Sequence, residues 1–205
     1  KIAENSNVSF HTDAVQYFGK HKVNIKELNI DFLCASAHKF YGPKGVGFIY
    51  KKQSIALNPT IHGGGQELNL RPGTENIAGI AGLGLAAEIA HTSMDKNNEK
   101  IKQLENHFIS CLDKAKINYR INGHNRLCGI LNITFFDISG QNLLMQLDLN
   151  NVAISFGSAC SSGTMKASQI LLDINMPIEE AQNTVRISIG KIHSYEEIEH
   201  VVKLI

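Results

Sequence analysis

The feature that most constrains this chain is a lysine, Lys39, that stands between an apolar segment and a glycine-rich turn. Residues 30–35 read as a short buried strand and residues 46–50 as a second strand, with Gly and Pro concentrated in the turn at 42–47. Apolar surroundings can lower the pKa of a lysine and favour a Schiff base with a carbonyl compound. An ordinary lysine beside a hairpin has no such chemistry, and this stretch alone leaves both interpretations open.

Composition limits the classes of protein to consider. The 205 residues are 43% hydrophobic, which is enough for one large or two small cores. The net charge of +1 comes without a basic block, so we expect neither nucleic acid nor a membrane as the main partner. No run of 18 apolar residues exists, and the first residues lack the apolar core of a signal peptide. The sequence therefore predicts a soluble, cytoplasmic protein.

The four cysteines differ in their surroundings. Cys34, Cys111, Cys128 and Cys160 form no C-x-x-C pair, so we expect neither a disulfide framework nor a metal site. Cys111 lies on an apolar stripe and Cys128 lies beside a strand, which predicts structural roles. Small residues surround Cys160, and an accessible, mobile thiolate is what a nucleophile needs. The alternative for Cys160 is a surface cysteine in a flexible loop.

Polar side chains follow a brief apolar segment, residues 8–10, that we expect to be a strand. His11, Asp13 and Gln16 would lie beyond its carboxyl end, where open α/β sheets place ligand-binding side chains. Asp13 can keep a pyridine nitrogen protonated, and Gln16 can donate to a neighbouring ring oxygen. Spacing alone equally allows Asp13 to cap a short helix that begins near Ala14.

A long loop and a small-residue helix follow the second strand. The loop at 56–76 contains three successive glycines, Arg71 and Thr74, and its backbone donors suit a phosphate. A flexible hairpin with an incidental arginine is the alternative. Residues 76–90 are small and apolar on nearly all faces, which predicts a buried helix packed against a neighbour or a subunit partner.

The residue pattern changes from small and apolar to amphipathic, which predicts an amphipathic helix over 95–112. We therefore place a domain boundary near residues 92–96. The remainder reads as an α+β layer with one sheet: strands at 119–121, 129–136, 152–155 and 185–189, and helices at 140–149, 166–174, 178–184 and 194–205. Ser194 reads as the N-cap of the last helix. Arg186 stands in an apolar strand, where an arginine needs an anionic partner: a substrate carboxylate or a structural acid.

Five motifs, in this order and spacing, resemble the pyridoxal-phosphate-dependent cysteine desulfurases of the class V aminotransferase fold, in the branch of NifS and IscS. They are His11-Thr-Asp-Ala-Val-Gln16, Ser36-Ala-His-Lys39 with the following Gly-Pro-Lys-Gly-Val-Gly, His62-Gly-Gly-Gly-Gln-Glu67 with Arg71-Pro-Gly-Thr74, Ser158-Ala-Cys-Ser-Ser162, and Val185-Arg-Ile-Ser-Ile-Gly190. The resemblance implies an α/β fold: part of a fold type I large domain, with a mixed, mostly parallel sheet, plus an α+β small domain. Residues 1–92 would be the second half of the large domain, and residues 93–205 the small domain with the catalytic-cysteine loop.

The resemblance also implies a role for each matching residue around the cofactor. Lys39 would hold pyridoxal 5'-phosphate as a Schiff base and then move the Cα proton of the substrate. Asp13 would pair with the pyridinium nitrogen, and Gln16 would bond the phenolic oxygen. Ser36 and His38 would hold the phosphate. Thr74 would join them from the other subunit of a homodimer.

The remaining implied roles concern the substrate. Arg186 would clamp the carboxylate of L-cysteine. Cys160 would attack the substrate sulfur, which leaves a persulfide on Cys160 and yields L-alanine. An iron–sulfur scaffold or another sulfur-acceptor protein would then receive the sulfur.

Two alternatives stay open beside the desulfurase. An aminotransferase of the same fold would use the same cofactor and would not need Cys160. A non-catalytic or split fragment would act as a docking module. The segment that the family carries before the Asp13 motif has no counterpart here, so we expect this chain alone to bind the cofactor weakly and to turn over poorly.

Overall fold

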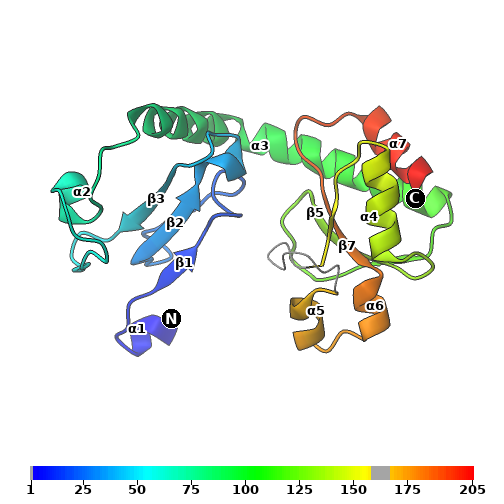
Figure 1. Ribbon diagram of the computed structural model, residues 1–205, viewed down its shortest axis with the longest axis horizontal. Coiled ribbons are helices and arrows are strands. Elements are labelled where there is room, and N and C mark those ends of the chain that lie inside the picture. The colour runs from blue at the N-terminus through cyan, green and yellow to red at the C-terminus, as the bar shows by residue number, and fades with distance from the viewer. Residues whose placement is uncertain (1, 158–166) are drawn as a thin grey trace. The chain divides into compact units, whose positions relative to one another are not determined.

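The computed structural model describes residues 2–157 and 167–205, and the chain divides into two compact units, Lys1–Asp95 and Lys96–Ile205 (Figure 1). Each unit contains a sheet of its own. The assignment of residues 1–92 and 93–205 to a large and a small domain stays a prediction. Cys160 lies outside the described residues.

The first unit is built on a three-stranded mixed sheet of order β1-β2-β3. Strand β1 is parallel to β2, and β2 is antiparallel to β3. Its elements are α1 (Ile2–Asn5), β1 (His11–Asp13), β2 (Phe32–Ser36), the 3₁₀ helix η1 (Ala37–Phe40), β3 (Gly47–Lys51), α2 (Gln66–Asn69) and the beginning of α3 (Ile77–Lys114). The strands expected around Lys39 are therefore present, with ends shifted by one or two residues.

The expected strand at residues 8–10 is wrong. The strand is His11–Asp13, because those three residues pair with β2, and the carbonyl of Phe10 accepts bonds from the backbone N–H groups of Asp31 and Phe32. His11 and Asp13 thus belong to the strand, and only Gln16 follows it.

Two small apolar clusters hold the first unit together, and Phe18 packs against both. Its ring meets the edges of Phe40 and Phe48, with ring centroids 5.2 and 5.1 Å apart. One cluster joins η1 to α3 through Ala86 and Ala90. The short helix that carries Lys39 is thereby fixed between the sheet and α3.

Helix α3 differs from the expectation in two respects. The two helices expected at 76–90 and 95–112 form one continuous helix, because no proline interrupts the 38 residues. Packing against a neighbour is also only partial within this chain, and packing against a subunit partner stays a prediction. Ala86 and Ala90 pack on η1, whereas the apolar side chains of the other face are exposed: Ile77, Ile80, Leu85 and Ile89.

By length and composition alone, α3 could cross a membrane, and it is the one such helix among the described residues. The mean hydropathy of its most apolar 18-residue window is 1.3. A core helix of a soluble protein passes the same test, so the finding by itself is weak evidence for a membrane span.

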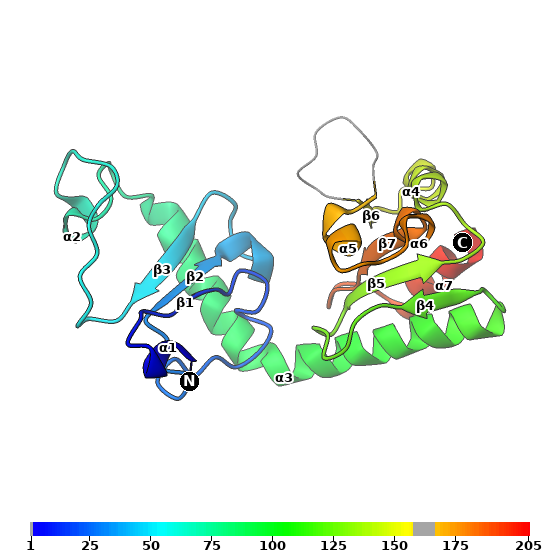
Figure 2. The same cartoon turned by 90° about the horizontal axis from the view of Figure 1, so that it is seen from below.

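The second unit contains a four-stranded antiparallel sheet of order β4-β5-β7-β6 (Figure 2). Its strands are β4 (Tyr119–Ile121), β5 (Ile130–Phe135), β6 (Ser155–Phe156) and β7 (Thr184–Ser188), and its helices are α4 (Gly140–Leu149), α5 (Gln169–Asp173), α6 (Ile178–Gln182) and α7 (Tyr195–Leu204). Each expected helix and strand has a counterpart, but the strand expected at 152–155 is misplaced: the observed strand is Ser155–Phe156, and residues 152–154 are not in a strand. The N-cap of α7 is Ser194, as predicted.

One face of this sheet forms the main core. Leu131, Ile133 and Phe135 of β5 are fully buried with Leu104 and Phe108 of α3. Side chains of α4 and α7 complete the cluster. At 25 cal/mol per Å² of buried apolar surface, each such side chain contributes about 2 kcal/mol to the free energy of unfolding.

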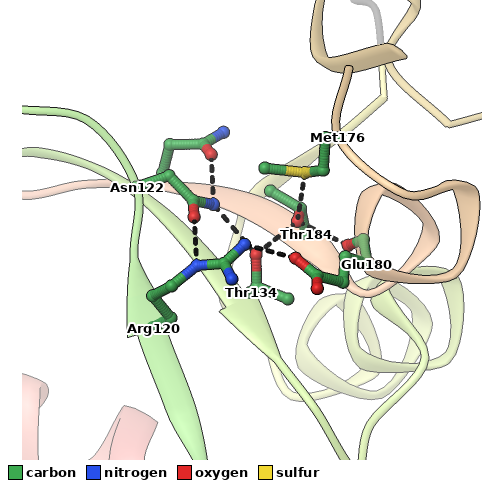
Figure 3. Close-up of polar contacts among 7 residues, drawn as sticks. Arg120, Asn122, Thr134, Met176, Glu180 and Thr184 are labelled. Carbon is green, nitrogen blue, oxygen red and sulfur yellow. Dashed lines mark hydrogen bonds and ion pairs between the residues drawn. The ribbon is translucent and has the colours of Figure 1, made fainter. Parts of the chain in front are cut away.

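A relay of hydrogen bonds runs across the same sheet and onto α6 (Figure 3). Asn122 Nδ2 donates to Thr134 Oγ1 at 2.9 Å, Thr134 and Thr184 share a bond of 2.7 Å, and Thr184 Oγ1 donates to the carbonyl of Glu180 at 2.6 Å. Each hydroxyl has one proton, so Thr134 must be the donor to Thr184. Arg120 donates to Asn122 and pairs with Glu180. The relay fixes β4, β5 and β7 in register.

Candidate active site

The candidate cofactor site lies at the carboxyl end of β1 and β2 in the first unit. The two strands are parallel, with Asp13 opposite Cys34, and the N–H of Ala14 donates to the carbonyl of Cys34 at 3.0 Å. Carboxyl ends of parallel strands meet at one edge of a sheet, where ligands bind in open α/β folds. Asp13 therefore lies at the same edge as Ser36, the last residue of β2.

Asp13 is fixed by the turn that follows it. Its Oδ1 accepts the N–H of Val15 at 2.8 Å, and the turn continues with bonds from Tyr17 and Phe18 to the carbonyl of Ala14. Residues 15–20 form a turn rather than a helix, so the helix-cap interpretation of Asp13 is wrong. The bond from the N–H of Val15 to Asp13 stabilises that turn. It is compatible with a cofactor role, because a carboxylate has a second oxygen and about four lone-pair sites.

Ser36 and His38 form a polar pair at the end of β2. Ser36 Oγ and His38 Nδ1 are 2.8 Å apart, with Ser36 half-buried and His38 exposed. A hydroxyl and an imidazole side by side provide two donors of the kind that hold a phosphate. Their geometry suits the phosphate-binding role that the resemblance implies.

Lys39 follows the pair on η1. It is half-buried, and the residues that flank the His38–Lys39 pair, Ala37 and Phe40, are buried against the first unit's core. Tyr41 ends η1 in the left-handed conformation with φ of 68°. The short helix thus presents Lys39 from a rigid support.

Gln16 is hydrogen-bonded to Lys20, a residue outside the five motifs. Lys20 Nζ donates to Gln16 Oε1 at 3.1 Å. Burial lowers the pKa of Lys20, and the nearby positive charge of Lys39 lowers it further. Lys20 lies four positions after Gln16 and outside the five motifs, so no sequence signal singled it out.

The donor set of this edge fits pyridoxal phosphate. A carboxylate can hold a pyridine nitrogen, an amide can hold a phenolic oxygen, a hydroxyl and an imidazole can hold a phosphate, and an amine can hold an aldehyde carbon. The side chains that would do so are Asp13, Gln16, Ser36, His38 and Lys39. Thr74 is exposed between α2 and α3, and the structure does not bring it to this edge.

Arg186 belongs to the second unit and lies on β7. Successive side chains of β7 point to opposite faces of the sheet, so Val185 and Ile187 are buried and Arg186 is exposed. The expectation that Arg186 has apolar surroundings is therefore wrong. Its Nη2 donates to Ser155 Oγ at 3.0 Å, across the β6–β7 ladder. Its partner in the structure is thus a hydroxyl and not a structural acid, and the guanidinium has further N–H groups that can donate to an anion.

The cysteines that the structure describes have structural surroundings. Cys111 packs against the second unit's core, with Sγ 3.6 Å from Nε2 of His107. Burial, followed by the charge of Glu105, raises the pKa of the Cys128 thiol and disfavours a thiolate. Within residues 2–157 and 167–205, no three His, Cys, Asp or Glu side chains gather in a metal-binding arrangement.

Comparison with known proteins gives one consistent result. The model of the aminotransferase class-V family matches residues 1–201. Cysteine desulfurase IscS of Dictyoglomus turgidum is 44% identical over 207 residues, with 100% of this chain and 52% of that protein covered. IscS of Methanosarcina thermophila is 37% identical over 207 residues, with 100% of this chain and 51% of that protein covered. The chain spans about half the length of the curated relatives it matches.

Solved structures agree with this result. The NifS-like protein of Rickettsia africae superimposes with a TM-score of 0.88 at 33% identity, over 99% of this chain and 54% of that one. SspA in complex with cysteine superimposes with a TM-score of 0.74 at 34% identity, over 94% of this chain and 53% of that one. The expected fold class, part of a fold type I α/β domain plus an α+β domain, is confirmed. The chain belongs to the aminotransferase class-V family, and the two curated relatives named above are cysteine desulfurases IscS.

Proposed function

We propose that this chain carries the catalytic residues of a cysteine desulfurase, which takes sulfur from L-cysteine and releases L-alanine. The observation that carries the proposal is the convergence of Asp13, Ser36 and Lys39 at one sheet edge, with the donor set that pyridoxal phosphate requires. Bound there, the cofactor supplies an electron sink for the bonds at the substrate Cα. The similarity to SspA, whose structure holds cysteine, supports the same substrate here.

The residues of the first unit would bind the cofactor and move one proton. The Lys39 amine would hold the aldehyde carbon and, once released, carry the proton that leaves and returns at Cα. Asp13 would keep the pyridine nitrogen protonated, and Ser36 with His38 would bind the phosphate. We propose Thr74 as a further phosphate donor, supplied by a second copy of the chain.

The residues of the second unit would bind and attack the substrate. The Arg186 guanidinium would hold the carboxylate of L-cysteine with two parallel N–H donors. The Cys160 thiolate would attack the sulfur of L-cysteine, so that an S–S bond forms as the C–S bond breaks and its electron pair stays with the carbon skeleton. The products are a persulfide on Cys160 and L-alanine.

The partners and the compartment follow from the same proposal. The exposed apolar side chains of α3 support a homodimer, because an exposed apolar patch is typical of a protein–protein interface. These side chains are Ile77, Ile80, Leu85 and Ile89. An iron–sulfur scaffold or another sulfur-acceptor protein would take the persulfide sulfur. We propose a cytoplasmic location, where thiols stay reduced.

The experiment is a single-turnover reaction of the purified chain with pyridoxal phosphate and L-cysteine. L-alanine is measured by mass spectrometry, and the added sulfur on Cys160 is located by peptide mapping. Cys160→Ser should abolish both signals, while Cys111→Ser, a substitution at a core cysteine, should keep both. L-alanine at the wild-type level from Cys160→Ser would contradict the proposed role of Cys160. Formation of the keto acid 3-mercaptopyruvate in place of L-alanine, equal in wild type and Cys160→Ser, would favour an aminotransferase. A chain that binds no cofactor would favour a docking module.

A further inference from the structure

We propose that Lys20 is a positioning residue for the cofactor, because it fixes the side-chain amide of Gln16 so that the amide nitrogen is presented as a donor. The inference rests on the proposed function, in which Gln16 bonds the phenolic oxygen of pyridoxal phosphate. It adds a residue that none of the five sequence motifs includes.

The first argument is the chemistry of the bond between Lys20 and Gln16. Lys20 Nζ and Gln16 Oε1 are 3.1 Å apart. An ammonium only donates, so its partner on the amide must be the oxygen. The two N–H groups of Gln16 Nε2 then point away from Lys20 and can donate to an anionic ring oxygen. The flipped amide would place its oxygen against that anion, which is repulsive.

The second argument is the rigidity of the turn that carries Lys20. Gly19 has a φ of +77°, and a Cβ there would lie 2.6 Å from Cβ of Phe40. The turn therefore rests directly on η1, one residue after Lys39. The N–H of Lys20 also donates to the carbonyl of Tyr17 at 3.1 Å. Backbone contacts thus hold Lys20 beside both Gln16 and the helix that carries Lys39.

The third argument is the electrostatic surroundings of Lys20, which is half-buried. Burial and the charge of Lys39 lower its pKa, so the bond to Gln16 offsets part of an electrostatic cost. A place beside another cation is unfavourable for Lys20 when no anion is near. Two neighbouring positive charges are favourable, by contrast, where a phosphate and a phenolate bind.

The test uses three variants of the full chain, a fourth for signal assignment, and two readouts. Lys20→Met removes the donor, Lys20→Arg keeps one, and Lys22→Met is the matched control, because the Lys22 side chain is 73% exposed and pairs with exposed Asp95. The first readout is the NMR signal of the Gln16 side-chain NH₂ in the cofactor-free chain, assigned by its loss in Gln16→Ala. The second is the dissociation constant of pyridoxal phosphate, titrated by its visible absorbance.

We expect Lys20→Met to shift the Gln16 NH₂ signal and to weaken cofactor binding about threefold to tenfold, the range for loss of one oriented hydrogen bond. Lys20→Arg should restore both, and Lys22→Met should match the wild type. An unmoved Gln16 signal, or equal affinity in Lys20→Met and wild type, would overturn the inference. A wild-type chain that binds no pyridoxal phosphate would count against the proposed function. The Gln16 NH₂ signal of the cofactor-free chain would still show whether Lys20 holds the Gln16 amide.

Discussion

Arg186 donates from Nη2 to the hydroxyl of Ser155 at 3.0 Å, and the two residues are opposite each other in the β6–β7 ladder. Both belong to the second unit. Cys160 follows Ser155 by five positions in the sequence. The bond therefore connects Arg186, which we propose binds the substrate carboxylate, to β6, the strand that precedes Cys160 in the sequence.

Replacement of Ser155 by Ala should weaken the use of L-cysteine. Without its acceptor the Arg186 guanidinium loses one orienting bond, so the L-cysteine concentration at half-maximal rate should rise about threefold to tenfold. The rate at saturating L-cysteine should change less, because Ser155 does not touch the reacting atoms in the proposed reaction. L-alanine formation as a function of L-cysteine concentration measures both.

Ser188→Ala is the control for Ser155→Ala, because Ser188 is exposed on the same strand two residues after Arg186. It should leave the concentration dependence unchanged. An equal effect of the two substitutions would show that the Ser155–Arg186 bond does not orient the clamp.

Replacement of Gly19 by Ala should destabilise the first unit more than replacement of Gly45. Both glycines have positive φ, +77° and +78°, so both pay the left-handed penalty of about 1 kcal/mol. Only the Gly19 substitution also collides with Phe40, whereas Gly45 has open space. We expect a total loss of about 3 kcal/mol for Gly19→Ala, since overpacking adds about 2 kcal/mol.

Urea unfolding followed by circular dichroism measures this difference. Hydrogen exchange of the η1 amides provides a local readout, because the collision would loosen the helix that carries Lys39. Similar midpoints for the two variants would mean that the turn moves away from Phe40 at little cost.

Replacement of Thr184 by Val should destabilise the second unit. The hydroxyl of Thr184 accepts from Thr134 and donates to the carbonyl of Glu180. Val leaves the buried Thr134 hydroxyl without its acceptor, while the Glu180 carbonyl keeps the N–H of Asn183. The expected loss is about 2 kcal/mol. Thr92→Val is the matched control, since the exposed Thr92 hydroxyl bonds only carbonyls of its own helix, and it should cost less than about 0.5 kcal/mol. Thermal unfolding compares the two.

Sequence patterns predicted the ends of helices and strands most accurately where the spacing of hydrophobic residues was regular. The helix at 140–149 and the strand at 119–121 have the predicted ends, because alternation and helical spacing depend on local burial. The strand at residues 8–10 was misplaced, since its true position is set by register with β2, far away in the sequence. The change of composition near residues 92–96 predicts a break, but α3 continues through it.

The candidate site was predictable as a set of residues and less so as a geometry. Motif order identified Asp13, Ser36 and Lys39, which the parallel pairing of β1 and β2 places at one edge. Lys20 was not found, because its relation to Gln16 depends on a turn whose path is fixed by Gly19 against Phe40. Contacts of that kind have no signature in a single sequence.

Replacement of Ser194 by Ala tests the cap of α7. Ser194 Oγ accepts the N–H of Glu197 at 3.2 Å, and the N–H of Ser194 donates to Glu197 Oε2 at 2.8 Å. Loss of this capping box should cost about 1 kcal/mol. Ser139→Ala is the matched control, because Ser139 occupies the N-cap position of α4 without a side-chain cap bond, and it should cost much less.

The same substitution should alter the response of stability to acid. The hydrogen bond with Ser194 lowers the pKa of Glu196 below its ordinary value of 4.5. A carboxyl whose folded pKa is lowered stabilises the protein above its unfolded pKa, and this contribution disappears as the pH falls through the folded pKa. As the pH falls below 4.5, the free energy of unfolding should therefore decrease more in the wild type than in Ser194→Ala. Urea midpoints measured across that range should converge for the two proteins, and parallel curves would show that Ser194 does not act on Glu196.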